Sequence, residues 1–168
     1  MSLDQLANIA EIVSSVAVII SLVYLALQIR SSTEAQRTST YHSIVSDFAA
    51  LNRSIASTPE LSFLLVNAME NFYDLKPDEK ARMSQLFFQL YHFFENMYYQ
   101  NKKGYLEEEV WAGWKLLMLT YHSRPGFQAW WKNRRDVYSA SFVRFLETEE
   151  IDKPIASYYD ISQLRAEA

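Results

Sequence analysis

The longest apolar stretch of the chain lies near its N-terminus, from Leu6 to Ile29, and carries no charged residue between Ile12 and Leu27. With a rise of about 1.5 Å per residue, this stretch forms a helix roughly 36 Å long. The hydrocarbon core of a bilayer is about 30 Å thick. The pattern therefore predicts a transmembrane anchor helix over residues 1–30.

The stretch has two alternatives to an anchor, a cleavable signal peptide and a buried helix of a soluble protein. The start, MSLDQLANIAE, has no basic residue, and the apolar run ends in Gln28-Ile29-Arg30 without a small-x-small site, which disfavours a cleavable signal peptide. A buried helix of a soluble all-α protein stays an alternative, because polar residues interrupt the stretch at Glu11, Ser14, Ser15, Ser21 and Gln28.

Small and polar residues of the anchor gather on one side of a helical wheel, at alternating spacings of three and four. The opposite side is mostly Ile, Val and Leu. Lipid tails give no hydrophobic drive for helix association, so membrane helices associate through close packing at small residues. We expect the chain to form a homo-oligomer, or to bind another membrane protein, through Ala7, Ala10, Ser14, Ala17, Ser21, Tyr24 and Gln28.

Glu11 lies beside this small-residue face. At the depth of the lipid headgroups, its carboxylate would contact interfacial water. A ring of such helices would instead enclose a polar path with a carboxylate at its mouth. A homo-oligomeric channel lined by Glu11, Ser14, Ser21 and Gln28 is therefore an alternative function.

Basic residues set the expected orientation of the anchor. No Lys or Arg precedes the apolar stretch, whereas Arg30 and Arg37 follow it. Under the positive-inside rule, the N-terminus is outside and the rest of the chain is in the cytoplasm.

The remainder of the chain predicts an all-α domain over residues 31–153. The polar segment 31–40 lacks Gly and Pro, so we expect it to continue the anchor helix into a connector that ends at residue 57. Apolar residues then recur at helical spacing. Further helix starts are predicted at Pro59, Pro77, Glu107 to Glu109, Pro125, and Ser139 or Ser141. The fold should be a bundle of about five helices, followed by a C-terminal arm over residues 154–168.

Composition narrows the possible functions. The aromatic content of 15% with only three glycines favours a helical domain with bulky packing. The net charge of −4 makes nucleic acid an unexpected partner. The absence of cysteine excludes disulfides and thiolate metal sites.

Chemistry-bearing residues are few in the domain. His92 and Glu95 are three apart on one predicted helix and are the weak candidates for metal ligands, but helical carboxylate sites normally use paired Glu-x-x-His motifs from several helices. No nucleophile elbow or glycine-rich phosphate loop is present. We therefore expect no metal centre, no cofactor and no enzymatic activity.

Aromatic residues suggest two further sites. Some of the aromatic residues between Phe87 and Trp114 would line a pocket for a small apolar ligand or a lipid. Such a pocket makes a ligand-sensing domain another alternative function. The same residues could instead form an aromatic core. A contact with the membrane surface is expected at Trp130, Trp131, Lys132, Arg134 and Arg135.

The segments LALQIR, FFENMYYQ, EEVWAGW and PGFQAWW resemble a group of uncharacterised bacterial proteins in which an N-terminal apolar helix precedes a helical domain. The resemblance spans about residues 3 to 147 and implies a bacterial inner-membrane location, with no activity or functional residue attached. The anchor and its small-residue face favour a single-pass, self-associating scaffold or accessory subunit, and the resemblance supports only the architecture and the location.

Overall fold

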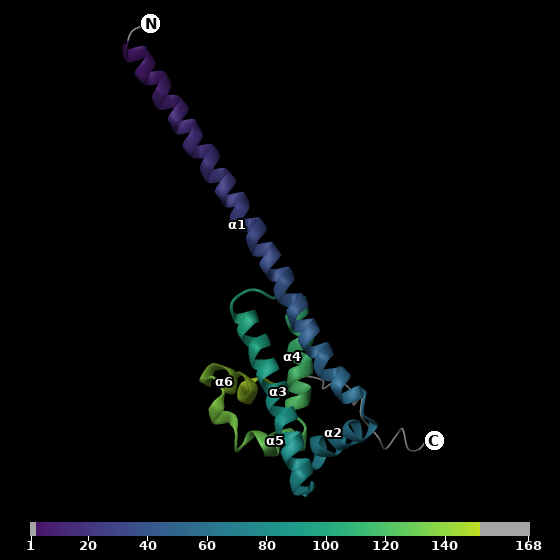
Figure 1. The fold of residues 1–168 in the computed structure, drawn as a ribbon. Coiled ribbons are helices and arrows are strands. Elements are labelled where there is room, and N and C mark those ends of the chain that lie inside the picture. Colours follow the sequence, from purple (N-terminus) through teal and green to yellow (C-terminus); the bar gives the residue numbers. More distant parts are fainter. Residues whose placement is uncertain (1–2, 152–168) are drawn as a thin grey trace. The chain divides into compact units, whose positions relative to one another are not determined.

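The computed structural model describes residues 3–151, except for the side chains of Ala7 and Ile9. Within this range the regular structure is helical and contains no strand, which confirms the predicted all-α class (Figure 1). Short 3-10 helices lie at Phe72–Asp74 and Arg135–Val137. The predicted C-terminal arm, residues 154–168, lies outside the described residues. The α-helices are α1 (Leu3–Ala56), α2 (Pro59–Asn71), α3 (Pro77–Lys102), α4 (Glu108–His122), α5 (Pro125–Trp131) and α6 (Ala140–Thr148).

Helix α1 is longer than an anchor alone. It continues without a break through the polar segment 31–40, as the lack of Gly and Pro there predicts. The chain divides into two compact units, Met1–Tyr41 and His42–Ala168, so the division falls beyond the predicted boundary at residue 30. The first buried apolar side chain of α1 is that of Ile44, which belongs to the second unit.

Helix ends in the second unit follow the predicted signals. Prolines occupy the start of α2, α3 and α5, where the missing N–H costs no helical hydrogen bond. At α3 the Lys76 N–H donates to Glu79 Oε2 at 2.9 Å, which satisfies a donor at the start of the helix. Helix α3 ends before Gly104, whose φ of 74° lies in the left-handed region that glycine adopts most readily.

The core of the second unit is aromatic and is built around α3. The end of α1 joins it, because the Phe48 ring stacks on Phe93 at 5.2 Å and meets the edge of Trp114 at 5.0 Å. Helix α5 packs against α2. The side chains that α3 buries are those of Met83, Phe87, Leu90, Tyr91, Phe94 and Met97.

Candidate functional site

The side chains in the apolar part of α1 are exposed wherever the structure describes them. Its most apolar window contains no buried residue, and Ile12 and Ile20 are 64% and 63% exposed. This helix is long and apolar enough to cross a membrane. It is the one helix among the described residues that meets both conditions.

The predicted small-residue face of α1 is exposed over its described side chains. Ala10, Ser14, Ala17, Ser21, Tyr24 and Gln28 are all accessible, whereas the side chain of Ala7 lies outside the described part. Tyr24 is the bulkiest member of the face and is 67% exposed. The face is therefore free to contact another chain.

Two serine hydroxyls in the apolar part of α1 form hydrogen bonds within the helix. Ser21 Oγ donates to the Ala17 carbonyl at 2.8 Å, and Ser15 Oγ donates to the Glu11 carbonyl at 2.8 Å. Such bonds to the carbonyl four residues earlier remove the cost of placing a free hydroxyl donor in an apolar medium. The Glu11 side chain is exposed.

Glu95 and His92 lie together on α3, but their geometry has a structural explanation. Glu95 Oε1 accepts the backbone N–H of Ser139 at 2.7 Å and so caps the start of α6. Its Oε2 lies 3.7 Å from His92 Nδ1. Across the described residues, no group of three or more His, Asp or Glu side chains is arranged to hold a metal ion.

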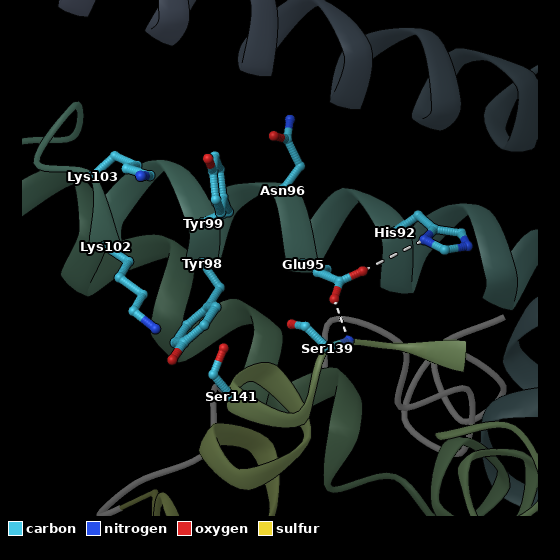
Figure 2. A pocket seen from close by; sticks show the side chains of 9 residues that line it. All are labelled: His92, Glu95, Asn96, Tyr98, Tyr99, Lys102, Lys103, Ser139 and Ser141. Carbon is cyan, nitrogen blue, oxygen red and sulfur yellow. Dashed lines mark hydrogen bonds and ion pairs between the residues drawn. The ribbon is translucent and has the colours of Figure 1, made fainter. Parts of the chain in front are cut away.

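A groove of about 630 Å³ lies beside this pair, between α3 and the start of α6 (Figure 2). Each residue that lines it carries a polar or charged group, and most of these residues belong to the last three turns of α3. The sequence pointed to His92 and Glu95 as weak metal ligands and to Tyr98 and Tyr99 among the aromatic residues of an expected apolar pocket, but not to the other lining residues. The full lining is His92, Glu95, Asn96, Tyr98, Tyr99, Lys102, Lys103, Ser139 and Ser141.

A second polar pair, which the sequence did not predict, is buried in the core. The Tyr91 hydroxyl lies 2.7 Å from His122 Nδ1. Burial lowers the pKa of His122 from 6.5 to about 4, against a smaller opposing effect of Glu147. The imidazole is therefore neutral at pH 7, and we assign its proton to Nε2, so that Nδ1 accepts the Tyr91 O–H. Burial also raises the pKa of Tyr91, which keeps the donor proton in place.

The predicted membrane-surface contact is wrong for the two tryptophans. Trp130 is fully buried and Trp131 is 2% exposed, because the short helix α5 turns both indoles into the aromatic core. The guanidinium of Arg134 lies 5.2 Å from the Trp130 ring, and Arg135 Nη1 pairs with Glu147 at 2.7 Å. Lys132 is exposed.

The aromatic residues expected to line an apolar pocket pack on one another. Phe87 stacks on Phe127 at 3.9 Å, and Tyr91 stacks on Trp131 at 4.7 Å. Phe88 meets the Trp130 ring edge-on at 4.9 Å. These rings occupy the space that the predicted ligand would need, so the core interpretation describes them better.

Comparisons with known proteins add no family. No protein-family model matches the chain, and neither a curated protein nor a solved structure is detectably similar to it. The resemblance drawn from the four sequence segments stays a prediction.

Proposed function

We propose that α1 anchors the chain in a membrane and that the second unit is a helical scaffold or accessory domain held there. The proposal rests on three properties of the apolar part of α1: its length, its lack of charged residues and the exposure of its described side chains. A core helix of a soluble protein buries such side chains, because each apolar Å² left in water costs about 25 cal/mol. Lipid removes that cost without a covering helix from the same chain.

The anchor associates with a second copy, or with another membrane protein, through its small-residue face. Ala17 and Ser21 let a neighbouring backbone approach closely, which is the main source of helix affinity in lipid. The bond from the Ser21 hydroxyl to the Ala17 carbonyl supports close packing, since the hydroxyl proton then needs no acceptor in the interface. Because the Ser21 hydroxyl already donates to this carbonyl, it has less need of water in a pore as an acceptor.

Orientation and location complete the proposal. Arg30 and Arg37, which follow the apolar segment, favour the cytoplasmic side for the second unit. A bacterial inner membrane fits this topology and the sequence resemblance. The domain acts there by binding, not by catalysis.

Membrane fractionation and mass spectrometry test the anchor. The chain should stay in the membrane pellet after extraction with alkaline carbonate, and the mass of the purified protein should include the N-terminal segment. Release into the supernatant would overturn the anchor. A mass that lacks the segment would identify a cleaved signal.

The mass of the detergent-solubilised particle tests the association. Ala17→Ile adds bulk to the small-residue face and should shift the particle toward the monomer. Ala26→Ile makes the same change on the opposite side of the helix and should leave the oligomer intact. A wild-type chain that is already monomeric would contradict self-association, as would equal effects of the two variants.

A further inference from the structure

The groove between α3 and the start of α6 holds several hydrogen-bond donors that no group among the described residues uses. Three of these donors are the Lys102 ammonium, the Tyr98 hydroxyl and the Ser141 hydroxyl, none of which forms a hydrogen bond or ion pair within residues 3–151. In Figure 2 their side chains extend toward the same end of the groove. Three donors of this kind at one place favour a ligand with several acceptor oxygens.

Packing fixes one of these donors. The Tyr98 ring lies 4.9 Å from the ring of Phe145 and 5.7 Å from that of Phe142, both on α6. The hydroxyl therefore has a defined position at the groove wall, although the ring body is partly buried. A donor that is already in place loses less entropy when it binds a ligand.

The local charge favours an anion. Glu95 is the one acid in the described lining, and both of its oxygens face partners, the Ser139 N–H at 2.7 Å and His92 at 3.7 Å. Lys103 brings a second cation to the same end of the groove, where its Nζ lies 5.4 Å from the Tyr99 ring centroid. The ammonium of Lys102 is left without an acidic partner among the described residues.

We propose that this groove binds a phosphate monoester, with its phosphoryl oxygens on Lys102, Tyr98 and Ser141. A phosphoryl group offers three oxygens, one for each donor, whereas a carboxylate offers two. The groove then continues along α3 past Asn96 to His92, which leaves room for a small polar group on the ester oxygen. The proposal is independent of the membrane anchor, because it uses only the second unit.

Calorimetric titration of the full-length protein in detergent tests the site with two probes, glycerol 3-phosphate and short-chain dihexanoyl phosphatidic acid. Both carry a phosphate monoester, and only the second carries acyl chains. We expect saturable binding that Lys102→Gln weakens about tenfold or more, which is the effect of losing a charged hydrogen bond. Tyr98→Phe should weaken binding by a smaller factor while keeping the ring in its packing site.

Lys132→Gln is the matched control, because Lys132 is an exposed lysine that does not line the groove. It makes the same charge change and should leave the affinity unaltered. Binding of both probes would identify a soluble phosphate ester as sufficient, whereas binding of phosphatidic acid alone would identify a lipid headgroup. The proposal is overturned if neither probe saturates, or if Lys132→Gln weakens binding as much as Lys102→Gln.

Discussion

Apolar side chains are exposed in the first unit of the chain and buried in the second. Ile12 and Ile20 of α1 are more than half exposed, while Phe87 and Trp130 have no exposed surface. The first unit is one helix with aliphatic side chains on most sides, and it has no second helix of its own to cover them. Hydrophobic content alone therefore does not decide burial, and we propose that lipid or another chain covers the apolar side chains of the first unit.

The hydrogen-bond partners of polar side chains also differ between the two units, since some side chains of the second unit bond to other helices. In α1, Ser15 and Ser21 donate to the backbone of their own helix. In the second unit, two buried contacts cross the fold, namely Tyr91 with His122 and the bond from Trp130 Nε1 to Ser84 Oγ at 2.9 Å, while the Thr120 hydroxyl donates within its own helix to the Leu116 carbonyl. Internal satisfaction is what a lipid environment demands of a spanning helix.

The largest expected effect comes from removing a buried ring of the second unit. Trp130→Ala should lower the free energy of unfolding by about 4 kcal/mol, because the cavity left behind adds to the lost burial. The indole is fully buried and also donates to Ser84. Denaturant unfolding of the detergent-solubilised chain, followed by the fluorescence of the remaining tryptophans, measures this loss.

Ile20→Ala is the corresponding change in the first unit. Ile20 is 63% exposed and does not belong to the buried core of the second unit, so this variant should leave that unfolding transition within about 0.5 kcal/mol of wild type. All four tryptophans, at positions 111, 114, 130 and 131, lie in the second unit and report on it. A similar loss in both variants would break the contrast between the units.

Acid should destabilise the second unit through His122. The pKa of this histidine is about 4 in the folded chain against 6.5 for an unburied ring, so the unfolded chain binds more protons between these values. Stability is then complete above pH 6.5 and falls as the pH drops toward 4, by about 3 kcal/mol in total.

Unfolding measured between pH 7.5 and 4 checks this dependence against two variants. His122→Gln removes the titrating ring and should flatten the profile over that range, although its stability at pH 7 is lower because Tyr91 loses its acceptor. His92→Gln makes the same substitution at an exposed histidine and serves as the matched comparison. An unchanged slope in His122→Gln would remove His122 as the cause.

A substitution where α5 packs closely against α2 should change the free energy of unfolding by an intermediate amount. A methyl group added at Gly126 would overlap Ala68 O and lie 2.8 Å from the Met69 carbonyl carbon, so Gly126→Ala should cost about 1–3 kcal/mol as the helices move apart. Gly113 lies inside α4 with nothing within 4 Å of the added methyl, and Gly113→Ala should stabilise by about 0.5–1 kcal/mol. Denaturant unfolding should show that the two Gly→Ala substitutions change the free energy of unfolding in opposite directions.

Local signals explain how much of the fold the sequence could predict. Pro59, Pro77 and Pro125 mark helix starts because proline costs nothing at a first turn, and Gly104 marks a helix end because its φ is positive. The absence of Gly and Pro from residues 31–40 correctly predicts a continuous α1. These signals act within a few residues and need no knowledge of tertiary contacts.

Sites that depend on tertiary contacts were predicted less well. Trp130 and Trp131 beside three basic residues fit a membrane surface by composition, but both indoles stack on the ring of Tyr91 and are buried. Tyr91 and His122 lie on different helices, so their spacing in the sequence carries no sign of the bond between them. The groove likewise joins Lys102 of α3 to Ser141 of α6, and only the folded chain brings them together.

The smallest expected effect concerns Glu95, where a metal ligand and a helix cap predict different results. As a cap for the Ser139 N–H, Glu95→Ala should cost about 1 kcal/mol of unfolding free energy. Glu95→Gln should recover most of that loss, because its amide oxygen still accepts the N–H while the charge is gone. A metal site on His92 and Glu95 would instead make both variants equally damaging and would let a chelator lower the stability of the wild type. Thermal unfolding of the wild type and both variants, with and without chelator, separates the two roles, and the bond of 2.7 Å to Ser139 favours the cap.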